Sequence, residues 1–258
     1  MSSSIDISLL EVAASLVLVA IAIVASRARG AGLEGDIAIA VARSFIQLTA
    51  IGLVITFIFD QDNAFFVIAL LGVMVVFGAF TARHRAVGVP GSLVPLLIAL
   101  ASAAAGTLGL VLVLGIIEAE PRYVVPVGGM VIGNAMTAAA VALNRLGEDV
   151  HGDARRIEAT LALGATATQA VAPLVRRSLR SGMITLVDST KTTGLIFFPG
   201  TMVGMLLAGA DPVDAVRLQL ILLYTLLGSV AIAALIATTL ARRNFFTPAH
   251  QLREPPAP

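Results

Sequence analysis

The sequence contains no cysteine and few charged residues. Among its 258 residues, Asp, Glu, Lys and Arg together make up 13%. The lack of cysteine excludes both disulfides and thiolate-ligated metal sites. The shortage of charge excludes an ordinary soluble domain, in which about 25% of residues are charged. With 58% hydrophobic residues, the chain is predicted to be an all-α integral membrane protein.

The motifs of common enzymes are also missing. No GxxxxGK[ST] loop is present, so the chain is not expected to bind ATP through such a loop. The histidines, His84, His151 and His250, lie in separate segments, and their spacing suggests no catalytic zinc site. No basic stretch precedes the first apolar run, so no cleaved signal peptide is predicted. We therefore expect neither an enzyme nor a resident cofactor.

Seven apolar segments are long enough to cross a bilayer as helices, which takes about 20 residues. Residues 1–247 are predicted to form one transmembrane domain, and the Pro-rich residues 248–258 a disordered tail. The seven segments are 7–26, 37–59, 64–82, 90–117, 122–145, 184–209 and 214–241.

The arginines alternate between the two ends of these segments. Arg27 and Arg29 follow the first segment, and Arg242 and Arg243 follow the seventh. The loops after the third and fifth segments are basic too, whereas Asp and Glu dominate the remaining loops. Because cytoplasmic loops are enriched in Lys and Arg, the N-terminus is predicted outside and the C-terminus inside. In a bacterium this membrane would be the cytoplasmic (inner) membrane.

The longest inner loop, about 147–182, has the pattern of short helices. Gly164 is predicted to end the first of them, because glycine tolerates the left-handed conformation of a C-cap. Thr166 and Gln169 have the spacing of a capping box for a second helix. Pro173 either kinks that helix or starts a new one. Such a segment could lie on anionic lipid headgroups through its arginines, or it could dock a soluble partner.

Polar residues are predicted to share the inner half of the membrane on three segments. A charge inside a bilayer costs about 2.5–3.5 kcal/mol, and buried charges are usually paired. Two interpretations remain open: a network that holds the helices together, or an inner vestibule through which a hydrated solute enters. Pro199 and Gly200 interrupt the sixth segment and are candidates for a kink or gate. The five polar residues are Arg43, Gln47, Asn134, Asp188 and Lys191.

Three stretches carry a resemblance to a known family: GGMVIGNAMTAAAVALNRL (128–146), EATLALGATATQA (158–170) and DSTKTTGLIFFPGTMVGMLLAGADP (188–212). Through them the chain resembles the UPF0014, or FetB/YbbM-like, family of ABC-transporter permeases. This family includes bacterial proteins assigned to iron export and plant aluminium-tolerance proteins. In the second stretch, Glu158 and Ala159 followed by Gly164 and Ala165 are similar to the EAA-type loop, a coupling helix that seats in a groove of the ATPase subunit.

The resemblance implies the membrane-spanning subunit of an ABC transporter, exporting iron or another metal and powered by a separate ATP-binding cassette subunit. A second permease copy, most simply in a homodimer, would supply the second docking loop for a two-fold ATPase pair. The alternative is an ion- or proton-coupled secondary transporter without an ATPase, a class in which broken helices and inverted repeats are common. Membrane lipid is the other expected partner, nucleic acid is not, and any metal ligands are unknown.

Overall fold

The computed structural model describes residues 8–61, 63–86, 88–249 and 251–253. Six of its helices are long and apolar enough to cross a membrane: α1, α2, α3, α4, α5 and α9. They confirm the predicted all-α membrane fold. The helices are α1 (Leu9–Ala28), α2 (Glu34–Gln61), α3 (Ala64–Arg85), α4 (Leu93–Val113), α5 (Pro121–Gly152), α6 (Ala154–Ala162), α7 (Ala167–Thr192), α8 (Gly200–Leu207), α9 (Pro212–Ala241) and the 3₁₀ helix η1 (Arg242–Phe245).

The sixth apolar segment, 184–209, is predicted as one span with a kink or gate at Pro199 and Gly200, and in the structure it is not a continuous helix. It is divided between the end of α7, a turn at 193–199 and the short α8. Gly194 takes a φ of 85°, a left-handed conformation that suits glycine. Pro199 has no N–H with which to extend the hydrogen bonds of α7, and it serves as the N-cap of α8. The chain is therefore broken, rather than kinked, just before Gly200.

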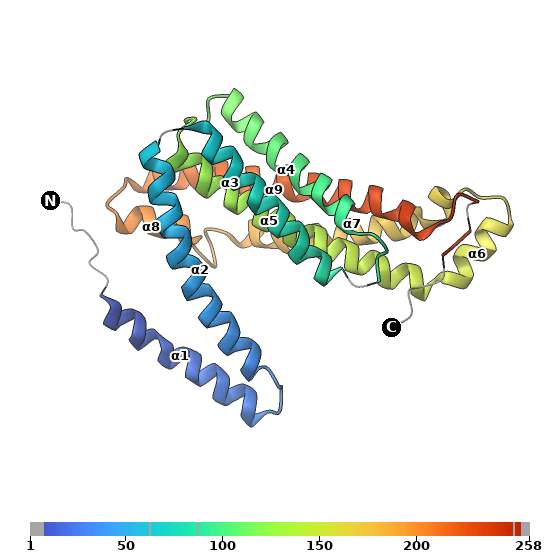
Figure 1. Ribbon diagram of the computed structural model, residues 1–258, viewed down its shortest axis with the longest axis horizontal. Coiled ribbons are helices and arrows are strands. Elements are labelled where there is room, and N and C mark those ends of the chain that lie inside the picture. The colour runs from blue at the N-terminus through green and yellow to red at the C-terminus, as the bar shows by residue number, and fades with distance from the viewer. Residues whose placement is uncertain (1–7, 62, 87, 250, 254–258) are drawn as a thin grey trace.

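Helices α3, α4, α5, α7 and α9 form a bundle, with α5 running through its length (Figure 1). Its core is built mainly from alanine and leucine. Lipid tails are as apolar as leucine, so membrane helices associate through close packing, which small residues permit. Members of this core include Ala79, Ala99, Leu100, Ala103, Ala135, Ala139, Leu143, Ala233 and Ala237.

A close contact between the backbones of two helices lies at Gly182 on α7. A Cβ placed there would lie 2.6 Å from the carbonyl oxygen of Ala138 and 2.9 Å from the Cβ of Ala142, both on α5. Gly182→Ala should therefore force α7 away from α5 and lower the free energy of unfolding by about 1–3 kcal/mol. Thermal unfolding in detergent measures this effect. Gly133→Ala on α5 is the matched control, since a Cβ there meets no atom within 4 Å; equal melting of the two variants would refute the packing argument.

Helices α1 and α2 form a hairpin that stands away from the bundle (Figure 1). A small cluster of Ile58, Val67 and Val125 joins the far end of α2 to α3 and α5. At the turn, Ser26 donates a hydrogen bond to Glu34 at 3.1 Å. Between Glu34 and Thr56 no α2 residue is buried. The hairpin is thus a defined element whose long faces remain uncovered within one protomer.

The C-terminal segment folds back on η1. The backbone N–H of Arg253 donates to the carbonyl of Phe245 at 2.8 Å, and its Nε donates to the carbonyl of Phe246 at 3.1 Å. The tail predicted from residue 248 is therefore placed as far as Arg253, apart from residue 250. Residue 250 and residues 254–258 lie outside the described residues.

Candidate functional site

The predicted inner loop is built largely from extensions of two long helices. Helix α5 has 32 residues, so it is about 48 Å long and exceeds the bilayer core of about 30 Å. With this length its last turns can extend beyond the bilayer core, and they carry α6 at the far end of the molecule (Figure 1). The segment 147–182 comprises the end of α5, α6 and the first part of α7.

One side of α6 is anchored on the bundle. Ile157 is only 1% exposed and belongs to the same core as Val150, Val171 and Leu174. Leu161 packs against that core as a partly buried residue. The apolar side of α6 is therefore covered by α5 and α7, which leaves its opposite side free.

The ends of these helices are capped as the sequence predicted. Gly164 takes a φ of 90° and donates its N–H to Leu161 at 2.9 Å, while Ala165 donates to Thr160 at 3.3 Å. This pair of bonds is a Schellman motif, which closes a helix C-terminus. At the start of α7 the Thr166 hydroxyl accepts from the N–H of Gln169 at 3.3 Å, and the Gln169 side chain accepts from the Thr166 N–H at 2.9 Å. The turn between α6 and α7 is thus locally well defined.

Ion pairs that the sequence did not reveal orient this end of the molecule. Arg177 on α7 contacts Asp153 at 3.2 Å and Asp149 at 3.7 Å. Asp149 also pairs with Arg145, one turn earlier on α5, at 3.1 Å. Arg177 and Arg145 are substantially exposed, so each pair adds about 1 kcal/mol at most. Their main effect is to fix α7 against the end of α5.

Pro173 lies inside α7 and does not begin a separate helix.

The free side of α6 and its tip carry the residues of the predicted coupling motif. Glu158, Ala159 and Gly164 are exposed, and Ala165 is half-buried. Leu163, which the sequence analysis overlooked, is 90% exposed at the tip. An apolar side chain beyond the membrane is not covered by lipid, so burial against a protein partner would stabilise it. The signal available in the sequence was a leucine directly before the capping glycine.

The five polar residues predicted to share the inner half of the membrane do not form one cluster within one protomer. Lys191 donates to Asp188 at 2.9 Å, and both side chains are more than half exposed. Asn134 donates to the carbonyl of Met130, on its own helix, at 2.9 Å. Arg43 and Gln47 are exposed on α2 and form no hydrogen bond or ion pair with the rest of the described chain.

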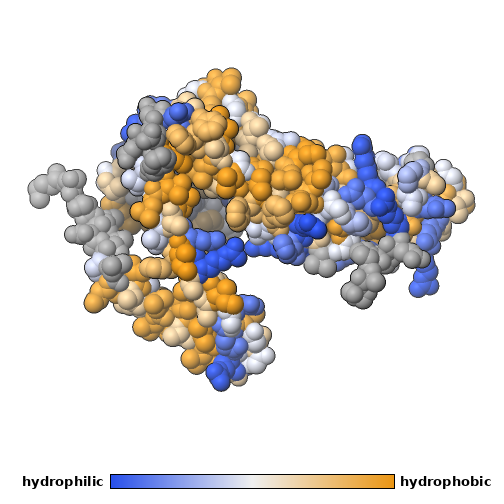
Figure 2. Space-filling view, in the orientation of Figure 1, coloured by the Kyte–Doolittle hydropathy of each residue, from blue (hydrophilic) through white to orange (hydrophobic). Residues whose placement is uncertain are grey.

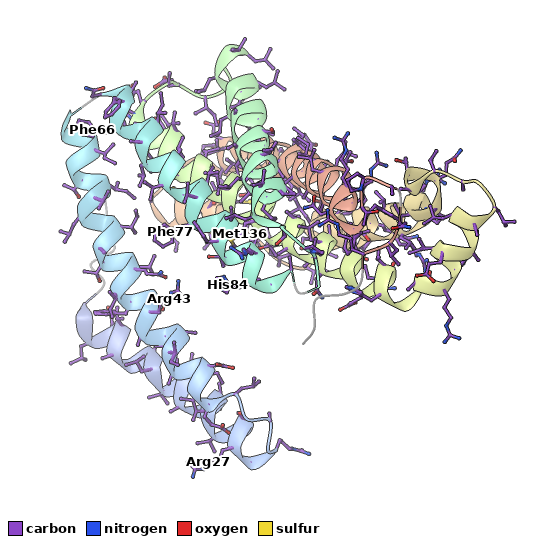
Figure 3. The ribbon with its side chains drawn as sticks, turned by 45° about the vertical axis from the view of Figure 1, so that its right-hand side comes forward. Arg27, Arg43, Phe66, Phe77, His84 and Met136 are labelled. Carbon is purple, nitrogen blue, oxygen red and sulfur yellow. The ribbon has the colours of Figure 1, made fainter. Side chains whose placement is uncertain are left out.

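The surroundings of Arg43 can be followed in Figures 2 and 3. Figure 2 shows apolar residues over most of the hairpin and the bundle, with a hydrophilic patch between the two. In Figure 3, Arg43 lies on the side of α2 that faces the bundle, in the direction of His84 on α3. His84 contacts the carbonyl of Phe80 through Nδ1 at 2.8 Å, and no hydrogen bond joins it to Arg43 in the described part of the chain.

No group of three or more His, Asp or Glu side chains within the described residues is placed to hold a metal ion.

A pocket of about 330 Å³ lies near the end of the bundle that is opposite to α6, between α5, α8 and α9. Its lining is mostly apolar, with Glu118 and Arg122 near its rim and Thr201 from α8. The short helix after the break thus borders a pocket at the predicted outer side.

Comparison with known proteins places this architecture in a family. The model for "Uncharacterised protein family (UPF0014)" matches residues 9–246. The chain belongs to the UPF0014 family. The resemblance seen in the sequence is therefore confirmed over nearly the whole chain, and this UPF0014 protein is a multi-pass membrane protein. No solved structure matches it significantly.

Relatives of this UPF0014 protein include plant and bacterial proteins. "UPF0014 membrane protein STAR2" of Oryza sativa subsp. japonica is 38% identical, over 96% of this chain and 87% of that protein. "Protein ALUMINUM SENSITIVE 3" of Arabidopsis thaliana is 37% identical, over 93% of this chain and 88% of that protein. "Probable iron export permease protein FetB" of Escherichia coli (strain K12) is also 37% identical, over 94% of this chain and 93% of that protein.

Proposed function

We propose that this UPF0014 protein is the membrane-spanning subunit of an ABC transporter in the inner membrane of a bacterium, with ATP hydrolysed by a separate ATP-binding cassette subunit. The observation that carries this proposal is α6, which α5 holds at the far end of the molecule with one side anchored through Ile157 and the other free. A short helix presented in this way suits a groove in a soluble protein. The name of the bacterial relative, an iron export permease, supports export of iron or another metal.

The docking surface comprises Glu158 and Ala159 on α6, together with Leu163, Gly164 and Ala165 in the turn. The rigid cap at Gly164 fixes the angle between α6 and α7. A displacement of α6 by the ATPase is then transmitted to α7, whose far end carries Asp188 and Lys191 and precedes the break at Pro199 and Gly200. The broken segment is the proposed gate, because a non-helical turn rearranges more readily than a continuous helix.

We also infer that two copies form the functional unit. Arg43 lies nine residues beyond the start of α2, about 13 Å along the helix, where exposure to lipid would cost about 2.5–3.5 kcal/mol. The turn at 193–199 likewise exposes backbone on a segment of membrane-spanning length, and exposed non-helical backbone is not tolerated in lipid. A second copy that covers both features removes both costs. Asp188, with its carboxylate more than half exposed, is the proposed partner of Arg43 across the interface.

Such a dimer would place the five inner polar residues around one path. In one protomer Arg43, Gln47, Asp188 and Lys191 are exposed, and Asn134 is half-buried. The inner half of the path could admit a hydrated solute, because it would be lined by polar side chains. These are Arg43, Gln47, Asn134, Asp188 and Lys191.

The break between α7 and α8 also favours a second candidate, an ion- or proton-coupled secondary transporter, since discontinuous helices are common in that class. Transport by purified protein in proteoliposomes separates the two. The tagged chain is purified in mild detergent with its bound partners, reconstituted and supplied with either ATP or an ion gradient. The ABC proposal requires a co-purifying ATP-binding subunit and ATP-dependent flux of the metal ion. Gradient-driven flux from the chain alone would favour the secondary transporter.

A further inference from the structure

A pocket of about 270 Å³ lies where the first turn of α7 meets the end of α9. Arg242 and Arg243 supply its charged wall, Thr168 a polar side, and Val171 and Phe246 an apolar side. The residues of the proposed ATPase docking surface do not line this pocket. It therefore has to be explained separately from the coupling function.

The charge in this pocket is unbalanced. Neither Arg242 nor Arg243 forms an ion pair in the described part of the chain, and the pocket lining contains no acidic residue. The Nε atom of Arg242 is shielded from solvent and has no hydrogen-bond partner. A buried guanidinium N–H without an acceptor is costly. An anion from outside the described residues would supply the missing acceptor.

The α7 backbone contributes further donors. The capping box occupies the N–H of Gln169, whereas the N–H groups of Ala167 and Thr168 have no acceptor among the described residues. Both residues line the pocket beside the arginines. Unpaired N–H groups in the first turn of a helix favour negative charge, and guanidinium groups match the oxygens of phosphate. This donor set fits a phosphate group better than a halide ion.

The length of α9 suits a pocket at the depth of lipid headgroups. Helix α9 has 30 residues and is about 45 Å long, close to the thickness of a bilayer including its headgroup layers, about 40–45 Å. A helix of that length that crosses the bilayer upright ends near the headgroup phosphates, and Arg242 follows directly after α9. Val171 and Phe246 offer an apolar wall beside the charged one, as the glycerol and upper acyl region of a lipid require.

We propose that this pocket is a phosphate-binding site for the headgroup of an anionic membrane lipid. The phosphate joins the start of α7 to the end of α9, and it satisfies the Nε of Arg242 and the free N–H groups of α7. The site does not depend on the identity of the transported solute or on the ATPase.

Native mass spectrometry of the intact protein tests the proposal, with phosphatidylglycerol and phosphatidylcholine offered as competing lipids. The wild type should retain phosphatidylglycerol preferentially. The double variant Arg242→Gln, Arg243→Gln should bind it at least about tenfold more weakly, because charge-assisted hydrogen bonds are lost. Arg243→Gln alone, at an exposed residue, should show a smaller loss without risk to folding. Arg29→Gln is the matched control, since Arg29 is an exposed inner arginine outside the pocket.

A competition with inorganic phosphate distinguishes the two sources of phosphate. Displacement of phosphatidylglycerol only by other anionic lipids supports the headgroup site. Binding of inorganic phosphate to the wild type, abolished in the double variant, supports a phosphate site but assigns it to a soluble ligand. If Arg29→Gln reduces phosphatidylglycerol binding as much as the double variant does, or if both lipids bind equally to the wild type, the pocket is not a phosphate site.

Discussion

The double variant Glu158→Gln, Gly164→Ala is expected to insert and fold normally, yet to lose at least about tenfold of its ATP-driven transport. Loss of one important interface contact costs about 2 kcal/mol or more, and about 1.4 kcal/mol already corresponds to a factor of ten. Glu158 is exposed on the free side of α6. Alanine at position 164 is strained at a φ of 90°, so the α6–α7 turn should change its angle. Transport and ATP hydrolysis, measured together in proteoliposomes, should become uncoupled.

Matched controls separate docking from general damage. Gly30→Ala introduces similar backbone strain, at a φ of 64° and with no atom within 4 Å, but in the α1–α2 turn. Glu148→Gln removes an exposed carboxylate from the end of α5, outside α6. Both controls should keep the wild-type ratio of transport to hydrolysis. A double variant at 158 and 164 that keeps that ratio as well would show that α6 does not couple the two.

The second large effect is expected at the proposed dimer interface. Arg43→Glu should convert the dimer largely to monomer, because a carboxylate then faces Asp188 of the partner subunit and like charges repel in a medium of low dielectric constant. Adding Asp188→Arg should restore opposite charges and recover the dimer in part. The mass of the complex in nanodiscs measures this directly. Asp188→Asn should lower the melting temperature too, since one lost partner leaves the other uncompensated.

Arg217→Glu serves as the control for charge reversal. Arg217 pairs with Asp214 at 3.2 Å on the exposed first turns of α9, at the predicted outer end. Its reversal should leave the dimer intact. If Arg43→Glu remains dimeric, or if Asp188→Arg fails to rescue it, Arg43 and Asp188 do not meet across the interface. If Arg43→Glu instead remains folded and dimeric but no longer transports, the two residues line the path without joining the protomers.

Local features of the site were predictable, whereas features set by tertiary packing were not. The cap at Gly164 and the capping box of Thr166 and Gln169 depend on neighbours within a few residues, so the sequence alone predicted them. The contacts of Arg177 with Asp153, and the pocket around Arg242, join segments far apart in the chain. Hydropathy and periodicity carry no information on such pairs.

Hydropathy identifies the segments that are able to cross the membrane, but it does not locate the ends of the helices. The predicted fifth segment stops at residue 145, but α5 continues to Gly152, and the continuation packs Leu146 and Val150 into the bundle core. The sequence located an interruption of 184–209 at Pro199 and Gly200, but hydropathy did not reveal that α7 already ends at Thr192 and that Gly194 turns the chain. The separation of α2 from the bundle left no trace in the sequence, since apolar helices in lipid look alike whether or not they touch protein.

The most direct test of ATPase docking uses the absence of cysteine from the chain. Leu163→Cys introduces one thiol at the tip of α6, and Leu33→Cys introduces one in the α1–α2 turn, where Leu33 is 49% exposed. A short thiol-to-amine crosslinker is applied to native membranes, and the crosslinked partner is identified by mass spectrometry. Docking at α6 predicts an adduct with an ATP-binding cassette subunit from position 163 and none from position 33. Transport-active membranes in which position 163 yields no such adduct would contradict it.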